Sequence, residues 1–72
     1  MIFNYRKLIS KITEKFEKRG DFAKLIPLSE NSLSKKLNNK VPFTSPEIYK
    51  MVKILGIDES EIHIYFYTLK VE

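Results

Sequence analysis

The polar side chains best suited to recognising a ligand lie near the middle of the chain. Asn31, Ser34, Lys35 and Asn38 recur at steps of three and four, so one face of a helix would carry all of them. An Asn amide can pair with both polar atoms of an adenine edge, and a Lys ammonium can reach guanine or a phosphate. Hydroxyl groups can bind phosphate oxygens, which adds Ser29 to the set. These residues predict a surface that binds DNA or a polar protein partner.

A short helix and a turn must position that face. Asp21 is expected to cap a helix over residues 22–26. Pro27 would end this helix, because proline lacks an N–H and clashes with the preceding turn. The small side chain of Ala23 would let a neighbouring helix approach closely. The residues expected to face inward are Phe22, Leu25 and Ile26.

The next helix would present the polar face. Ser29 is a favoured N-cap for a helix over residues 30–37. Leu33 and Leu37 form its apolar stripe and would anchor it against the preceding helix. The whole segment, about residues 21–38, has the pattern of a helix-turn-helix, in which the first helix braces the second and the second enters the DNA major groove.

Three further helices are predicted around this pair. The first spans about residues 5–18, with Asn4 as its N-cap and Gly20 as a left-handed ending. Another begins at Ser45, which serves as the cap in front of a proline, and ends at Gly56. The last covers about residues 59–66 and would open with a capping box and a hydrophobic staple formed by Asp58, Glu61, Ile57 and Ile62. The predicted fold is an all-α, compact five-helix domain over residues 1–72.

The charge of the chain is concentrated in its first part. The chain has 72 residues and a formal net charge of +4. Residues 1–40 carry ten basic and four acidic side chains, whereas residues 41–72 carry three basic and five acidic ones. A basic half favours a polyanionic or acidic partner. A basic stripe on the first helix would track a phosphate backbone or simply be solvated; it comprises Lys7, Lys11, Lys15 and Lys18. The candidate phosphate contacts are Lys7, Lys11, Lys36 and Lys40.

The composition argues against several classes of function. The absence of Cys excludes a disulfide framework and a thiolate zinc site. His63 is the only histidine, and the two glycines do not form a phosphate-binding loop, so we expect no enzyme, no metal, no cofactor and no small-molecule substrate. No apolar run approaches the roughly 20 residues of a membrane span. The first residues also lack the features of a signal peptide, which predicts a cytoplasmic protein.

The C-terminal segment is apolar on more than one side. One helical face would carry Ile62, Tyr65, Phe66 and Leu69, whereas Ile64 and Tyr67 point elsewhere and form a candidate protein interface. Alternation of Tyr67, Leu69 and Val71 with polar residues would also suit a short strand that pairs with a second copy. A third possibility is a terminal helix that covers the core and leaves two apolar side chains exposed.

Glu30 stands at the start of the predicted recognition helix, where a carboxylate has three possible uses. It can accept a hydrogen bond from cytosine N4, or it can stabilise the positive end of the helix dipole. It can also form a salt bridge with a basic protein surface, such as the DNA-binding face of a repressor.

Taken together, these motifs resemble the Cro-like regulators of temperate phages of Gram-positive bacteria. The resemblance covers nearly the whole chain, and within that group the sequence is similar to the modulator-of-repression proteins of lactococcal phages. It is carried by the segments Phe3-Asn4-Tyr5, Phe22-Ala23-Lys24-Leu25, Leu28-Ser29-Glu30, Leu33 to Val41, Ser45-Pro46-Glu47-Ile48, Leu55-Gly56-Ile57, Glu61-Ile62 and Tyr65 to Val71.

The resemblance implies a role in the lysis–lysogeny switch, and two mechanisms remain open. In the first, the chain is an antirepressor or modulator that binds the phage repressor protein and alters its binding to operator DNA. In the second, the chain is a stand-alone Cro-type repressor that binds operator DNA as a homodimer, because one recognition helix reads too few base pairs for tight specific binding.

Overall fold

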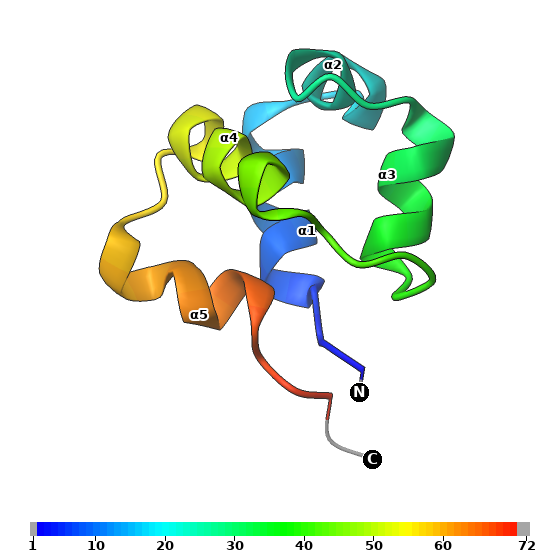
Figure 1. Cartoon of the computed structure of the whole chain (residues 1–72). Helices are drawn as coiled ribbons and strands as arrows, with labels where there is room; N and C mark the ends of the chain where they lie inside the picture. Colours follow the sequence, from blue (N-terminus) through cyan, green and yellow to red (C-terminus); the bar gives the residue numbers. More distant parts are fainter. Residues whose placement is uncertain (1, 71–72) are drawn as a thin grey trace.

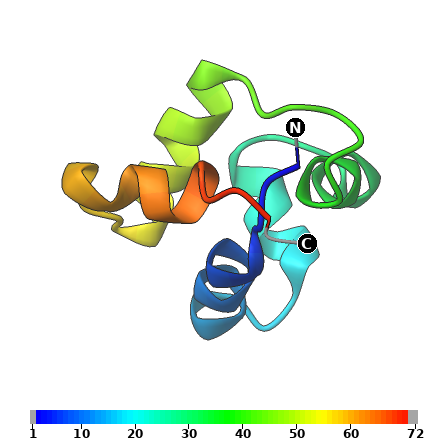
Figure 2. The same cartoon turned by 90° about the horizontal axis from the view of Figure 1, so that it is seen from below.

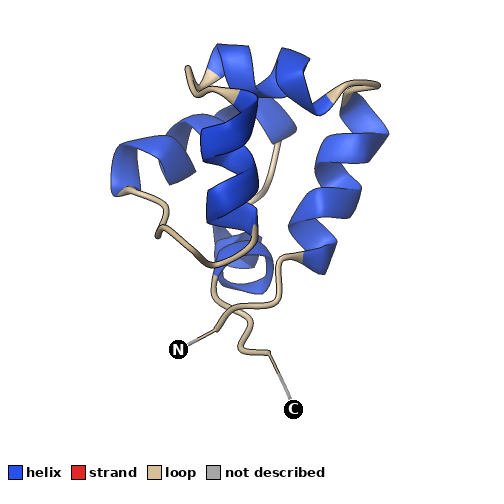
Figure 3. Cartoon of the chain, turned by 90° about the vertical axis from the view of Figure 1, so that its right-hand side faces the viewer, coloured by secondary structure: helices blue, strands red, loops and turns tan. Residues whose placement is uncertain are grey.

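Five α-helices and one turn of 3₁₀ helix form the regular structure of residues 2–70, which are the residues that the computed structural model describes (Figure 3). This confirms the all-α, five-helix prediction. In chain order the elements are α1 (Arg6–Lys15), α2 (Arg19–Leu25), α3 (Glu30–Leu37), α4 (Ser45–Leu55), η1 (Glu59–Glu61) and α5 (Ile62–Phe66).

Helix α1 is the element around which the others pack, because α2, α4 and α5 all contact it (Figure 1). Its apolar residues Leu8 and Ile12 are buried, as their spacing predicts. Helix α3 packs against α2 and contributes Leu33 and Leu37 to the core. The largest fully buried side chains come from all five helices or the residues next to them: Leu8, Ile12, Phe22, Ile26, Leu33, Met51, Leu55 and Phe66.

The connection between α1 and α2 differs from the sequence prediction. Helix α1 ends at Lys15, and Phe16 is extended, with its ring 5.3 Å from the ring of Phe22. Because this aromatic contact turns the chain early, α2 begins at Arg19 and includes Gly20 in its first turn. The prediction of a left-handed Gly20 was therefore wrong.

Two further details of the predicted first and second helices need correction. Asp21 lies within α2 and is not its cap. Leu25, which was expected to face inward, is 55% exposed because Phe22, Ala23 and Ile26 occupy the buried face. Asn4 precedes the cap position of α1, yet its side-chain Oδ1 accepts a hydrogen bond from the backbone N–H of Arg6 at 2.9 Å.

The start of α4 is displaced by one residue from its predicted place. Thr44 is the N-cap, and its hydroxyl accepts a hydrogen bond from the backbone N–H of Glu47. The Glu47 carboxylate accepts one in return from the N–H of Thr44 at 2.9 Å, which completes a capping box. Ser45 is thus the first helical residue. The helix ends at Gly56 as predicted, and this residue has a φ of 67°, which lies in the left-handed region.

The predicted capping box in front of α5 does not form. The Asp58 carboxylate accepts a hydrogen bond from the hydroxyl of Ser60, and its side chain makes no cap hydrogen bond. The chain instead closes a 3₁₀ turn, in which the N–H of Glu61 donates to the Asp58 carbonyl at 2.9 Å. Helix α5 then begins at Ile62, three residues later than expected.

Aromatic rings fasten the loop between α3 and α4 to the rest of the molecule. Phe43 lies edge-on to Tyr5 at 5.4 Å and to Phe66 at 5.8 Å. Such edge-to-face pairs add stabilisation beyond the burial of their area. The loop that follows α3 is therefore tied to both the beginning and the end of the chain.

The two ends of the described chain run side by side (Figure 2). Phe3 and Leu69 form an isolated antiparallel bridge, and the N–H of Asn4 donates to the Thr68 carbonyl at 2.7 Å. The prediction that Leu69 continues the helical face of Ile62, Tyr65 and Phe66 was wrong, because Leu69 lies beyond the end of α5 and is 53% exposed. The sequence pattern also suited a short strand that pairs with a second copy, and the structure instead has a single bridge between Leu69 and the chain's own N-terminal segment. Val71 lies outside the described residues.

Asn39 joins the end of α3 to the N-terminal segment. Its φ is 63°, its Oδ1 accepts a hydrogen bond from the N–H of Phe3 at 2.9 Å, and its Nδ2 donates to the Phe3 carbonyl at 2.9 Å. We expect Asn39→Gly to lower the free energy of unfolding by about 1–2 kcal/mol, because it removes both hydrogen bonds and tolerates the backbone. Asn39→Ala should cost roughly 1 kcal/mol more, because a Cβ disfavours the left-handed conformation. Urea unfolding measures both, and equal stability of the two variants would contradict the backbone part of the prediction.

Candidate functional site

Helix α3 presents the predicted polar face to solvent. Its bounds, Glu30–Leu37, are those expected from the sequence. Leu33 is completely buried and Leu37 is 6% exposed, so the apolar stripe anchors the helix as predicted. The opposite side is open to solvent: Asn31, Lys35 and Asn38 are exposed, and Ser34 is half-buried. The structure therefore brings these four candidate residues together on one side of one helix.

Ser29 serves the helix itself. Its hydroxyl accepts a hydrogen bond from the backbone N–H of Ser32 at 3.0 Å and donates to the Ser32 hydroxyl at 2.9 Å. Both directions of the Ser29 hydroxyl are thus used within the chain. Its contribution to a binding surface is to fix where α3 starts.

Asn38 and Ser34 are linked to each other in the free chain. The Asn38 Nδ2 donates to the Ser34 carbonyl at 2.9 Å and lies 3.5 Å from the Ser34 hydroxyl. Pairing of this amide with both polar atoms of an adenine edge would require the local bond to break. Asn31 and Lys35 are exposed and have no such side-chain hydrogen bond within the described residues, which makes them the stronger candidates for direct contacts.

Glu30 packs over the start of α2. A Cβ placed at Gly20 would lie 2.7 Å from the Glu30 Oε1, so the carboxylate occupies the space that glycine leaves there. The side chain remains exposed and shares a pocket of about 440 Å³ with Glu17, Arg19 and Ser34. Gly20 thus allows Glu30 to lie between the two helices, which the sequence pattern did not reveal.

Lys36 is not available for phosphate contact, contrary to the prediction. It is 8% exposed, and its Nζ lies 2.5 Å from the Glu47 Oε1. This ion pair connects α3 to the first turn of α4. Burial opposes the charged form of Glu47, but the hydrogen bonds from Lys36 and Thr44 and the Lys36 charge outweigh it and hold the pKa of Glu47 below 4.5. Lys35 and Lys40 remain exposed on this side of the molecule.

The basic stripe of α1 is shorter than predicted. Lys7 is exposed and Lys11 is half-buried, but Lys18 lies beyond the end of the helix. The Lys15 Nζ donates to the Ile54 carbonyl at 3.0 Å and so supports the last turn of α4. Lys7 and Lys11 are the residues of this stripe that stay candidates for phosphate contact.

The two residues predicted as a protein interface differ in exposure. Tyr67 is 53% exposed and packs edge-on against Phe3 at 5.9 Å, whereas Ile64 is half-buried. Ile64 lines a small pocket at the start of α1, next to Arg6 and Lys7. Burial raises the pKa of Tyr5, and the nearby Tyr67 phenol adds to this shift.

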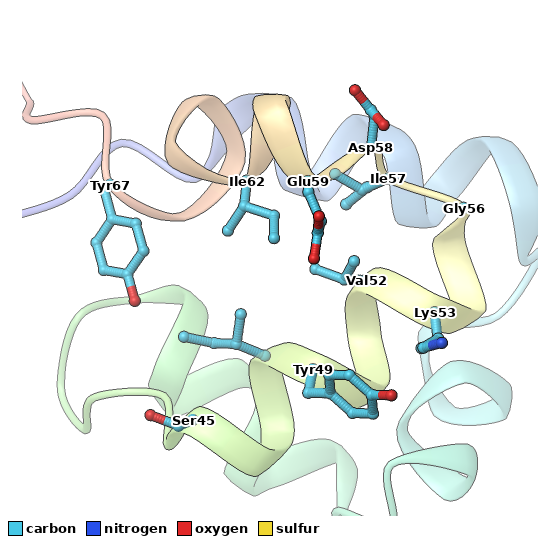
Figure 4. Close-up of a pocket in the computed structure, with 11 residues that line it drawn as sticks. Ser45, Tyr49, Val52, Lys53, Gly56, Ile57, Asp58, Glu59, Ile62 and Tyr67 are labelled. Atoms are coloured by element: carbon cyan, nitrogen blue, oxygen red, sulfur yellow. The ribbon is translucent and has the colours of Figure 1, made fainter.

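A groove between α4 and the η1–α5 segment was missed by the sequence reasoning. It has a volume of about 760 Å³ (Figure 4). The sequence pattern assigned Ile48 and Val52 to the core, yet both are only partly buried and line the groove. The feature of the sequence that could have indicated the groove is Tyr49, a large aromatic residue that lies off the inward face of α4 and is 63% exposed.

Neither a metal centre nor a membrane span is found in the part of the chain that the structure describes. Within residues 2–70, no three His, Cys, Asp or Glu side chains are grouped so that they would hold a metal ion. None of the described helices has the length and apolar character needed to cross a bilayer.

Comparison with known proteins places the chain in a family. No curated protein matches it. The solution structure of the modulator of repression (MOR) of the temperate bacteriophage TP901-1 from Lactococcus lactis is similar to this chain, with 40% sequence identity and a TM-score of 0.78. The similarity covers 100% of this chain and 97% of that one. A family model described as "Protein of unknown function (DUF739)" matches residues 1–69. The chain therefore belongs to the DUF739 family.

Proposed function

We propose that this chain regulates transcription in the lysis–lysogeny switch of a temperate phage, as a modulator that binds the phage repressor protein and alters its binding to operator DNA. The similarity to the modulator of repression of TP901-1, which extends over the full length of both chains, carries this proposal. In this account α2 and α3 form the helix-turn-helix predicted over about residues 21–38. The host-cell cytoplasm is where such a regulator would act.

The proposed contact surface is the exposed side of α3. Asn31 and Lys35 lie free of the core on a helix that Leu33 fixes in place. Glu30 adds a carboxylate beside them, which can pair with a basic side chain of the repressor's DNA-binding face. Lys35 and Lys40 supply the opposite charge, so this face offers both signs to a protein partner.

The second candidate is a stand-alone Cro-type dimeric repressor that reads operator DNA with α3. The observation that favours it is the combination of Asn31 and Lys35 on the exposed face of a helix that packs against α2 after a four-residue connection. Lys7, Lys11 and Lys40 would then contact phosphates.

Titration of labelled operator DNA separates the two candidates. The chain, the repressor of the same phage, and their mixture are each titrated and followed by fluorescence anisotropy. We expect the chain alone to bind weakly and without sequence preference, and to shift the operator affinity of the repressor by about five- to 150-fold. A tight, sequence-specific complex of the chain alone, with an affinity that falls steeply with salt, would instead establish the Cro-type function.

Variants locate the surface in the same assay. Lys35→Ala and Asn31→Ala should each weaken repressor binding by more than about 1 kcal/mol, as contact residues near the centre of an interface do. Lys24→Ala is the matched control, since Lys24 is exposed on α2 and outside this face. Loss of binding only in Ile64→Ala or Tyr67→Ala would move the site to the C-terminal segment and refute the assignment to α3.

A further inference from the structure

The groove between α4 and the η1–α5 segment has an apolar floor and two walls of opposite charge. Ile48, Val52, Ile57 and Ile62 form most of its floor. Lys53 is the charged side chain of the α4 wall (Figure 4). Asp58 and Glu59 are those of the opposite wall, where the chain enters η1.

This distribution of charge is complementary to itself. A two-fold axis that runs along the groove, in the plane of the contact, would bring the Lys53 wall of one molecule opposite the Glu59 wall of a second. The same operation would form the pair a second time, because a two-fold interface uses the same patch on both molecules. An unrelated helix would need an acidic flank and a basic flank in the correct order, whereas a second copy supplies both.

The rim of the groove also carries side chains typical of interfaces. Tyr49 is 63% exposed and Tyr67 is 53% exposed, one at either side of the groove. The Lys53 Nζ lies 5.2 Å from the centre of the Tyr49 ring, so the ammonium and the ring form one unit on the α4 wall. Tyrosine is enriched among the residues that dominate binding energy.

We propose that this groove is a homodimer interface, in which the Lys53 of each molecule pairs with the Glu59 of the other across a two-fold axis. The exposed Tyr49 of each molecule, which shares the α4 wall with Lys53, then faces the η1–α5 wall of the other molecule. The interface lies away from α3, which is on the far side of the molecule in both Figure 1 and Figure 2. Dimerisation therefore leaves the surface of the proposed function free.

The size of the molecule limits the strength of this dimer. The described chain exposes 5121 Å², and a specific interface covers about 10% of a small protein's surface, or roughly 500 Å² per molecule. A contact near the lower limit of specific interfaces predicts a weak dimer that dissociates on dilution. The dimer should also weaken with salt, because its charge pairs lie at the rim.

Charge exchange tests the proposal by sedimentation equilibrium over chain concentrations that extend from the micromolar to the millimolar range. The full chain should show a monomer–dimer equilibrium. Lys53→Glu alone and Glu59→Lys alone should each weaken self-association at least about tenfold, because like charges then face each other twice. An equimolar mixture of the two variants should recover a heterodimer, since both pairs are again of opposite charge. Lys24→Glu, with the same change of charge on α2, should associate as the unaltered chain does.

Three results would overturn the proposal. They are a monomer at every concentration, self-association that neither variant changes, and a mixture of the two variants that stays monomeric while each keeps its helical circular dichroism. If the repressor binds in this groove, Lys53→Glu will instead lower repressor binding and leave the monomer unchanged. Loss of repressor binding in Lys35→Ala with the dimer intact concerns only the proposed function, so the two failures are distinguishable.

Discussion

Leu33→Ala is expected to lower the free energy of unfolding by about 2–5 kcal/mol, the largest effect of any single truncation on α3. Leu33 is fully buried and anchors α3 to the rest of the molecule, so alanine loses the transfer free energy of the side chain and leaves a cavity. A domain of this length has roughly 4–11 kcal/mol of stability in total. The variant should therefore be partly or largely unfolded at room temperature, as measured by urea denaturation.

Leu25→Ala is the matched control for this prediction. It makes the same deletion in the preceding helix, but Leu25 is 55% exposed, and alanine is at least as favourable in a helix. Its unfolding midpoint should lie close to that of the unaltered chain. If the two variants lost the same stability, α3 would not be held by Leu33 and the placement of its exposed face would have to be revised.

Glu47→Gln should lower the free energy of unfolding by about 2–3 kcal/mol at pH 7, because it leaves the nearly buried Lys36 ammonium without its counter-charge. Glutamine retains the oxygen that accepts from the N–H of Thr44, so the capping box survives and the loss reports mainly on the ion pair. Glu14→Gln removes an exposed carboxylate of α1 and should change stability by less than about 0.5 kcal/mol.

The effect of Glu47 should depend on pH in a defined direction. The pKa of its carboxyl is lower in the folded chain than the ordinary value of 4.5, so its contribution is present in full above that value. The contribution is lost as the pH falls through the folded-state pKa. The difference in unfolding free energy between the unaltered chain and Glu47→Gln should therefore be constant near pH 7 and shrink below about pH 4.5. A difference that stays constant down to pH 2 would contradict the assigned role of this ion pair.

Features that depend on neighbouring residues could be predicted from the sequence. The bounds of α3, the Ser29 cap, the end of α4 at Gly56 and the buried Leu33 follow from capping chemistry and helical period, both of which act within a few residues. The exposure of Asn31 and Lys35 followed from the same period.

Features that depend on distant contacts could not be predicted in this way. Lys36 looked like one of several surface lysines, because nothing local indicates that Glu47 lies opposite it in the folded chain. The early end of α1 depends on the contact between Phe16 and Phe22. The groove likewise arises from how α4 and α5 pack, and the sequence pattern alone cannot distinguish its floor from the core.

The central claim is that the exposed side of α3 binds the phage repressor, and backbone amide NMR spectra of the chain titrated with that repressor test it most directly. We expect shifts or broadening at Glu30, Asn31, Ser34, Lys35 and Asn38, with amides of the α4–α5 groove unaffected at low chain concentration. Changes confined to Ile64, Tyr67 and the groove, with α3 unperturbed, would contradict it.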